Sequence, residues 1–313
     1  MREKGFNVEG WDRNLACVDW GRHRAYSLQG YKNECLFQSV DLATFAVMEK
    51  IVENGPKSPY SCLLHPETKQ LWFSEDGRGE VFALDLETAR IKSLGGGPGM
   101  QRHFQARAYW NPVTRRVGIF GGYGMGAVRN DRSEFDAAAG RWIEVEPDRR
   151  DTELWPRICL PLVQDASGRR VFLAGGQGNP SGKQGVRTNA LRAWNGQFYV
   201  LDDIWELDLE KNSWHRLLPI GHLDDPKRLR AILYHPRLQG LLIFMAAKLP
   251  DDSSSPAEIL LLRPGVDRKP LRLSWKGQPS CLSTLYLLTV DPQTEEILIL
   301  ADDGIFRVSV ELA

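Results

Sequence analysis

Basic residues recur at one place in the repeated pattern of this chain, a few residues before the first strand of successive repeats. They are Arg13, Lys57, Arg102, Arg157 and Arg228. Guanidinium and ammonium groups bind carboxylates and phosphates through charge-assisted hydrogen bonds. The spacing therefore predicts an anion-binding rim that would suit acidic side chains of a partner. Chance is the alternative, because 40 basic residues are spread over 313 positions.

Arginine and tryptophan are residue types that often dominate binding energy at protein interfaces. Several occur on the irregular segments between the predicted strands, above all on the insertion 177–201. The residues predicted to form the binding surface are Arg102, Arg129, Arg157, Arg187, Arg228, Trp155 and Trp194. Two alternatives stay open: the insertion could pack on itself without a partner, and Trp155 could fill the gap between two repeats.

The residue types needed for catalysis or metal binding do not come together in the same way. His103 and His222 lie on separate loops without an identified third ligand, and no two cysteines have the short spacing of a zinc site. The pair Asp302-Asp303 precedes a glycine, which is typical of a hairpin turn rather than of an acid–base pair. We therefore predict no catalytic residues, no metal and no cofactor.

One short turn occurs six times and indicates the architecture that must position these residues. Its copies are Asp19-Trp20, His65-Pro66, Asn111-Pro112, Asp165-Ala166, His235-Pro236 and Asp291-Pro292. Apolar residues precede each copy and a new apolar run follows it, so the unit is strand, tight turn, strand. The copies lie 46 to 70 residues apart. A four-stranded unit repeated at such intervals is typical of the blades of a β-propeller.

The sequence predicts an all-β fold: a six-bladed β-propeller of four-stranded antiparallel blades, forming a single domain over residues 1–313. The predicted blades are 11–52, 58–94, 103–146, 157–218, 228–275 and 281–313. The last unit lacks a fourth strand. We expect the N-terminal segment 4–9 to supply it, which would close the ring and cover an open sheet edge.

Polar residues at the turns are expected to cap them. Four aspartates recur between the third and fourth strands, where a short acceptor can bond the backbone two residues on. They are Asp41, Asp85, Asp136 and Asp208. His65 and His235 occupy the Asp/Asn position of the repeated turn, so we expect both to act as turn caps.

Strand direction alternates through a blade, so the turns after the first and third strands lie on one face and the other loops lie on the opposite face. The long loops all fall on this second face: 94–103, 122–130, 147–157, 177–201, 219–228 and 246–257. Binding residues concentrate on loops held by a rigid scaffold. The loop face is therefore the predicted working surface.

The third and fourth units, residues 104–146 and 158–217, resemble kelch repeats. Each has an apolar strand, a double glycine, a polar–aromatic strand and a late tryptophan, in residues 117–122, 130–136 and Trp142 and again in 171–176, 202–208 and Trp214. The glycines allow close backbone approach, and the tryptophan covers apolar area between blades. The resemblance implies a propeller, and kelch-like propellers include sugar-processing enzymes such as sialic-acid mutarotases.

The composition narrows the class of partner. The formal net charge is 0, which gives no overall field toward nucleic acid or a membrane surface. No stretch approaches the roughly 20 apolar residues of a membrane span, and the N-terminus lacks a signal-peptide pattern. The five scattered cysteines predict free thiols and a cytoplasmic location.

These patterns together predict a non-catalytic propeller that binds another protein or peptide, an acidic one being suited to the basic rim. It would act as a scaffold or adaptor subunit of a larger assembly through its long loops. The alternative is a mutarotase-like enzyme, or a binder of small sugar acids, that uses the anion-binding rim at the mouth of the central channel. We expect no nucleic-acid partner and no membrane.

Overall fold

The computed structural model describes residues 16–31, 34–53, 55–56, 59–75, 79–96, 105–124, 127–146, 153–178, 192–194, 198–223, 225–246, 257–276, 285–301 and 304–311. These residues form six antiparallel sheets, each built on four strands, and the fold is the predicted all-β, six-bladed β-propeller. The only helix in this part of the chain is the three-residue 3-10 turn η3 (Pro226–Arg228). Two compact units divide the chain: an N-terminal unit (10–160 and 176–199) and a C-terminal unit (1–9, 161–175 and 200–313).

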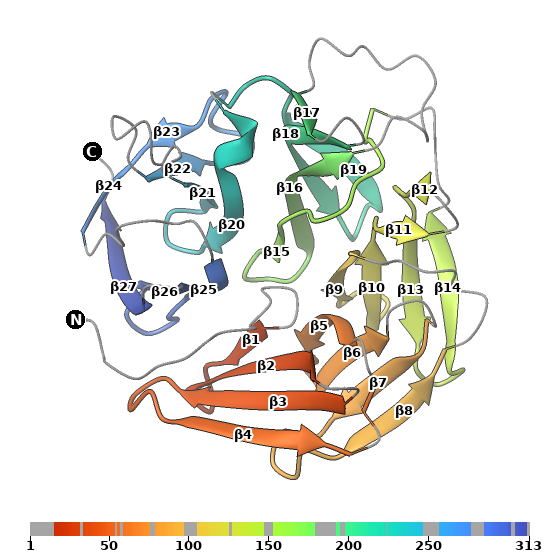
Figure 1. Cartoon of the computed structure of the whole chain (residues 1–313). Helices are drawn as coiled ribbons and strands as arrows, with labels where there is room; N and C mark the ends of the chain where they lie inside the picture. Colours follow the sequence, from red (N-terminus) through yellow and green to blue (C-terminus); the bar gives the residue numbers. More distant parts are fainter. Residues whose placement is uncertain are drawn as a thin grey trace. The chain divides into compact units, whose positions relative to one another are not determined.

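Three blades make up most of the N-terminal unit, and in each of them the strands pair in chain order (Figure 1). Blade one is β1 (Ala16–Asp19), β2 (Arg24–Tyr31), β3 (Glu34–Asp41) and β4 (Val47–Val52); blade two is β5 (Pro59–Leu64), β6 (Leu71–Glu75), β7 (Val81–Leu84) and β8 (Ile91–Gly95); blade three is β9 (Arg107–Asn111), β10 (Arg116–Phe120), β13 (Arg132–Asp136) and β14 (Arg141–Glu146). A small hairpin of β11 (Tyr123–Gly124) and β12 (Ala127–Val128) follows β10.

The other three blades lie mainly in the C-terminal unit. Blade four is β15 (Leu162–Gln164), β16 (Arg170–Gly178), β18 (Phe198–Asp208) and β19 (Ser213–Leu218), with β17 (Arg192–Trp194) as an additional strand; blade five is β20 (Leu229–His235), β21 (Gly240–Met245), β22 (Glu258–Leu262) and β23 (Leu271–Arg272); blade six is β25 (Leu285–Val290), β26 (Ile297–Ala301), β27 (Gly304–Glu311) and β24 (Ser274–Lys276).

The outer strand of blade six differs from the sequence-based expectation. β24, predicted to end blade five, pairs instead with β27, so that Trp275 lies opposite Val310. Trp275 packs against an apolar cluster to which blades five and six both contribute, and this burial explains why the strand joins blade six. The chain therefore passes from the outer edge of one blade to the outer edge of the next. The segment 4–9, expected to provide this strand, lies outside the described residues.

Within each of the two compact units, the core lies between neighbouring blades, whose sheets pack face to face. Leu28 and Phe37 of blade one and Phe73 of blade two are buried in one cluster. Burying a side chain of this size contributes roughly 1.5–3 kcal/mol. Trp142, the late tryptophan of the third repeat, packs with residues of blades two and three, and its Nε1 donates to the carbonyl oxygen of Gly79 at 2.7 Å. The prediction that this tryptophan covers apolar area between blades is confirmed.

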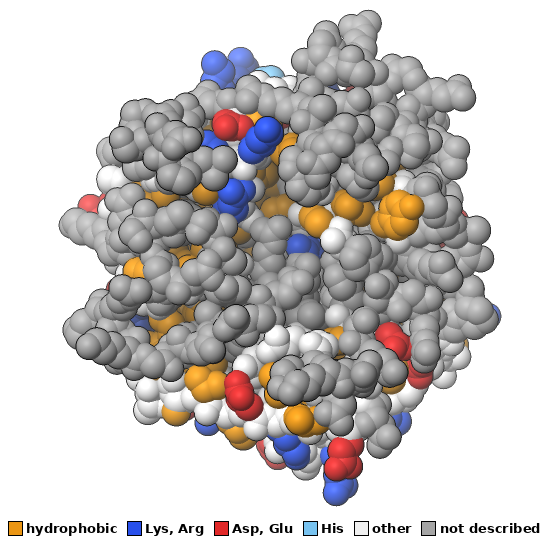
Figure 2. Space-filling model, viewed as in Figure 1, with side chains coloured by type: hydrophobic (Ala, Val, Ile, Leu, Met, Phe, Trp, Pro, Cys, Tyr) orange, Lys and Arg blue, Asp and Glu red, His pale blue; other side chains and the backbone are white. Residues whose placement is uncertain are grey.

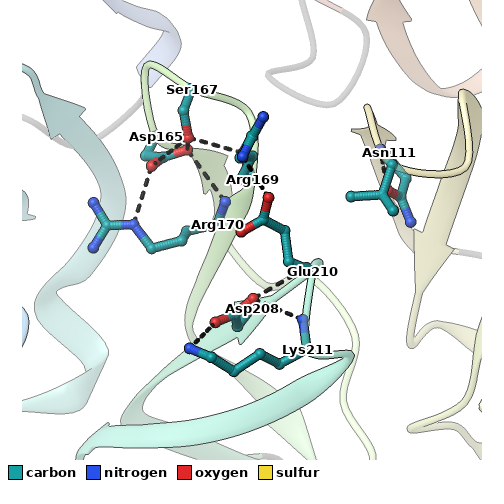
Figure 3. A network of polar contacts seen from close by, with 9 residues as sticks. Asn111, Asp165, Ser167, Arg169, Arg170, Asp208, Glu210 and Lys211 are labelled. Carbon is teal, nitrogen blue, oxygen red and sulfur yellow. Dashed lines mark hydrogen bonds and ion pairs between the residues drawn. The ribbon is translucent and has the colours of Figure 1, made fainter.

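Short polar side chains hold the turns as the sequence predicts. The Oδ1 atoms of Asp41, Asp85, Asp136 and Asp208 each accept the backbone N–H groups two and three residues on, at 2.8–3.1 Å. These bonds stabilise the carboxylate form, and they are the main cause of the lowered pKa of Asp41 and Asp85. In blade four the two turns of one face are also tied together by ion pairs, Arg169–Glu210 between the turns and Lys211–Asp208 within one of them (Figure 3).

The two histidines of the repeated turn behave differently. His65 Nδ1 accepts the N–H groups of Glu67 and Thr68 at 3.3 and 3.2 Å, so the predicted cap is confirmed. The ring of His235 instead contacts the carbonyl oxygen of Glu295, through Nε2 at 3.1 Å, and its Nδ1 has no partner among the described residues. The prediction for His235 was wrong, because an acceptor on the next blade engages the far nitrogen of the longer imidazole side chain.

The double glycines of the third and fourth repeats have left-handed backbones. The φ angles are +70° and +98° at Gly121 and Gly122, and +54° and +94° at Gly175 and Gly176. A Cβ atom at position 121 would lie 2.7 Å from the carbonyl oxygen of Arg157, the same oxygen that accepts the N–H of Gly122 at 2.9 Å. Glycine is therefore required here both for the backbone conformation and for the close approach.

Candidate functional site

Arg157, a predicted binding residue, is fully buried, with 0% of its surface exposed. Its Nε donates to the carbonyl oxygen of Trp155 at 3.0 Å. Its backbone N–H donates to the carbonyl oxygen of Arg129 at 3.0 Å. A buried guanidinium that donates to a nearby backbone carbonyl group stabilises the conformation of the loop that carries it. The structure therefore places Arg157 under the surface, where it supports the connection between β14 and β15.

The structure brings Arg129 and Trp155 close to Arg157. Arg129 forms a two-pronged ion pair with Asp131, at 2.8 Å from Nε to Oδ1 and 3.0 Å from Nη2 to Oδ2. The side chain of Trp155 is half-buried. The other predicted residues of this part of the chain, Arg102 and Arg187, lie outside the described residues, and for Trp194 the structure describes only the backbone, in β17.

Arg228, the remaining predicted residue, lines a cavity of about 510 Å³ in the C-terminal unit. Its wall is built from the loop that follows β19, from η3, and from the strands of blade five. The lining residues are Gly221, His222, Leu223, Arg228, Met245, Glu258, Leu260, Lys269, Pro270 and Arg272. The predicted loop 219–228 thus contributes to the site, together with residues that the sequence did not single out.

Arg228 is fixed by its position at the end of η3. Asp225 caps this turn by accepting the N–H of Lys227 at 3.1 Å. The Arg228 side chain is 7% exposed, its Nε donates to the carbonyl oxygen of Ala246 at 2.7 Å, and its Nη2 lies 3.8 Å from Oε2 of Glu258. A guanidinium held in this way is a rigid cationic element of the cavity wall.

Asp202 in β18 holds the loop that carries His222. Its buried carboxylate accepts the N–H of Gly221 at 2.8 Å and the N–H of Leu223 at 3.0 Å, one on each side of the histidine. Burial raises the pKa of Asp202, and the two backbone bonds oppose that rise. The pair Asp202-Asp203 therefore serves loop geometry: the second carboxylate accepts the indole N–H of Trp205 at 2.7 Å.

Glu258 and Arg272 line the cavity from the two outer strands of blade five, β22 and β23. Arg272 Nη2 lies 2.9 Å from Glu258 Oε1, and 68% of the Arg272 side chain is exposed. Glu258 is thus shared between a buried arginine and an exposed one. The turn that leads to Lys269 is braced by Arg263 and Asp267, whose two-pronged ion pair keeps the pKa of Asp267 below its ordinary value.

The cavity combines cationic groups with an apolar floor. Arg228 and Arg272 lie beside one carboxylate, Glu258, and Lys269 also lines the cavity. Leu223, Met245 and Leu260 supply apolar surface. Figure 2 shows basic side chains gathered around an acidic one in the region of η3. Such a site can take an anionic group that carries an apolar neighbour, with the exposed cations at the rim and the buried arginine within.

Sequence reasoning missed Glu258, Lys269 and Arg272 because they lie on or beside the outer strands, and Glu258 comes directly after the long loop 246–257 rather than within it. One signal was available: Glu258 begins the third strand of its unit and Arg272 ends the fourth, so antiparallel pairing brings them near each other. The cavity also needs Gly221 to Leu223 from the preceding blade, and that approach depends on how the two blades pack.

The described residues contain no group of three or more His, Cys, Asp or Glu side chains arranged to hold a metal ion. They also contain no helix with the length and apolar composition that a membrane crossing requires. Comparison with known protein families and with curated proteins finds no match to this chain.

Proposed function

We propose that this protein is a binding propeller without catalytic activity that holds an acidic, partly apolar segment of another protein in the cavity of blade five. The observation that carries the proposal is the lining, in which three cations and one carboxylate surround an apolar floor. A carboxylate of the partner would meet Lys269 and Arg272 at the rim. An apolar neighbour of that carboxylate would cover Leu223, Met245 and Leu260.

Exposed apolar residues support a protein partner. Val266 and Leu271 are 69% and 43% accessible and lie in the same turn and outer strand as Lys269 and Arg272. Protein interfaces combine an apolar centre with a charged rim and are enriched in arginine. A macromolecular partner that reaches beyond the cavity would cover these side chains, whereas a small ligand within it would leave them in water.

The proposal includes a scaffold or adaptor role in the manner of kelch-type propellers. The left-handed double glycines and the tryptophan between blades support the kelch resemblance. Cys17, Cys35, Cys62 and Cys159 form no disulfide bond among the described residues, which supports action in the reducing cytoplasm.

A small sugar acid is the second candidate ligand. The cavity volume of about 510 Å³ falls within the range of about 300–1,000 Å³ that is usual for small-molecule sites. Its carboxylate would use the same cations as the acidic peptide would. The two candidates differ in size and in their need for the apolar residues outside the cavity.

Calorimetric titration with two peptides tests the proposal. The first alternates leucine and glutamate over ten residues, and the second replaces every glutamate with glutamine. We expect binding of the acidic peptide only, weakened about tenfold or more in the double variant Lys269→Ala/Arg272→Ala, since charge-assisted bonds contribute roughly 1.5–3 kcal/mol each. Raising the salt to 1 M should weaken it further, because the screening length falls to about 3 Å.

Arg237→Ala is the matched control. Arg237 is an exposed arginine of the same blade, and its ion pair with Glu295, at 3.2 Å, is comparable to that of Arg272. We expect this variant to bind the acidic peptide as the wild type does. An equal loss of affinity for the acidic peptide in Arg237→Ala and in the double variant would refute the assignment of the cavity as the binding site. Saturable binding of sialic acid without peptide binding would favour the second candidate.

A further inference from the structure

The outer strand of blade one, β4, is exposed on both of its faces. Five of its six side chains are exposed, and Val47, Met48 and Ile51 are 40%, 44% and 46% accessible. They are three of the seven large apolar residues that are exposed in the described part of the chain. Natural edge strands are usually short, charged or covered, because an open edge invites pairing with another chain. β4 carries two such charges, Glu49 and Lys50, but its three other exposed side chains are large and apolar.

On one side, the backbone of β4 is also unpaired among the described residues. β4 pairs with β3 from Cys35–Val52 to Val40–Val47, and no other strand pairs with it among the described residues. In an antiparallel sheet, every second residue directs its N–H and C=O groups away from a given neighbour. The outer side of β4 therefore presents a row of hydrogen-bonding groups to a further strand.

A ladder of polar side chains crosses blade one and ends at this edge. Gln29 Nε2 donates to Gln38 Oε1 at 2.9 Å, and Gln38 Nε2 donates to Glu49 Oε1 at 2.5 Å. The last group of the ladder is thus a carboxylate on the exposed strand. Lys50 points to the opposite face, because adjacent strand residues alternate, and its Nζ donates to the carbonyl oxygen of Thr88 at 2.6 Å.

We propose that β4 is a docking edge for an extended strand of a different protein. The backbone of that strand would pair with the outer side of β4, in the manner of β-strand addition. Its recognition pattern follows from one face of β4: an arginine or lysine opposite Glu49, and apolar residues opposite Val47 and Ile51. This surface is separate from the cavity of blade five and does not depend on the function proposed for that cavity.

A second copy of this chain fits the edge less well. Directly opposed residues in a two-fold antiparallel pair must lie on the same face, so their numbers differ by an even amount. The two registers with the longest overlap of β4 with itself are therefore centred on Glu49 or on Lys50. Each of them sets two like charges directly opposite one another, which destabilises the pair.

Binding of a designed strand peptide tests the proposal. The probe is acetyl-Thr-Val-Thr-Arg-Thr-Ile-Thr-amide carrying a fluorescent label, and its twin has glutamate in place of arginine. We expect the arginine peptide to bind at least tenfold more tightly in anisotropy titrations. It should also slow hydrogen exchange of the β4 amides. The variant Glu49→Gln, which keeps the ladder bond, should bring the affinities of the two peptides to within about threefold of each other.

Ile51→Lys should abolish binding of the arginine peptide. Its matched control is Val113→Lys, which changes another exposed β-branched residue (54% accessible, against 46% for Ile51) on a turn of blade three and should have no effect. The proposal is overturned if neither peptide protects the β4 amides, if the control loses as much affinity as Ile51→Lys, or if Glu49→Gln keeps the tenfold preference. Concentration-dependent dimerisation that Ile51→Lys removes would instead identify a second copy as the occupant.

Discussion

Replacing Gly121 with alanine should destabilise the protein far more than the same change at another left-handed glycine. Gly121 and Gly265 have nearly the same φ, +70° and +75°, so both variants carry the conformational cost of about 1 kcal/mol. Only at position 121 would the new Cβ meet a backbone oxygen at 2.7 Å, that of Arg157; nothing lies within 4 Å at position 265.

The added loss at position 121 can be worked from the bonds around that oxygen. It accepts the N–H of Gly122 at 2.9 Å, and the N–H of Arg157 itself donates to Arg129 at 3.0 Å. Moving the Arg157 backbone away from a methyl group weakens both bonds, each with a net value of about 1 kcal/mol, and leaves buried groups partly unpaired. We expect the free energy of unfolding to fall by about 3–4 kcal/mol in total for Gly121→Ala and by about 1 kcal/mol for Gly265→Ala.

Urea unfolding followed by circular dichroism measures both values. Equal slopes would show that the unfolded states are comparable, so the midpoints report stability directly. A similar loss for the two variants would refute the reasoning, because it would mean that the contact with the Arg157 oxygen carries no energy. A loss at Gly265 exceeding that at Gly121 would contradict it outright.

Three further variants test other parts of the structure. Burial lowers the pKa of His65, so the stabilising contribution of the neutral ring is present above the ordinary histidine pKa of about 6.5 and is lost as the pH falls through the lower folded value. In urea titrations, the difference in free energy of unfolding between wild type and His65→Asn should be smaller at pH 5.5 than at pH 7.5. An equal difference at the two pH values would contradict this. Glu134→Gln should lower the free energy of unfolding by about 2–4 kcal/mol, measured by thermal unfolding. The two oxygens of the buried carboxylate accept from Asn111 Nδ2 at 2.6 Å and from Thr114 Oγ1 at 2.7 Å, and an amide has only one oxygen to accept them. A loss of stability under about 1 kcal/mol would argue against this network. Glu258→Gln should tighten calorimetric binding of the acidic peptide about threefold to tenfold, since it removes the carboxylate that competes for Arg272, and weaker binding would show that Glu258 chiefly positions the arginines.

Local patterns in the sequence were sufficient for most of the fold. The four turn aspartates and His65 act on residues two or three positions away, so their spacing alone predicts their bonds. Trp142 was predicted correctly from its late position in the repeat, and it packs with residues of blades two and three. The double glycines were informative because a Cβ atom at Gly121, Gly175 or Gly176 would lie within 3 Å of a backbone oxygen.

The errors arose where distant segments compete for one position. β24 could extend blade five or join blade six, and the burial of Trp275 favours blade six. His235 contacts Glu295 on the following blade, a partner 60 residues away that no local pattern reveals. The cavity likewise combines residues from 221 to 272, and outside the predicted loop 219–228 none of them was predicted.

The central claim, an acidic ligand in the cavity of blade five, is tested most directly by proton NMR of the histidine rings during titration with the leucine–glutamate peptide. His222 lines the cavity, whereas His215 is an exposed histidine on β19 whose ring contacts Ser213. With both signals assigned through His222→Asn and His215→Asn, we predict a saturable shift of the His222 signal and an unchanged His215 signal. Saturable peptide binding that leaves His222 unmoved would contradict the account.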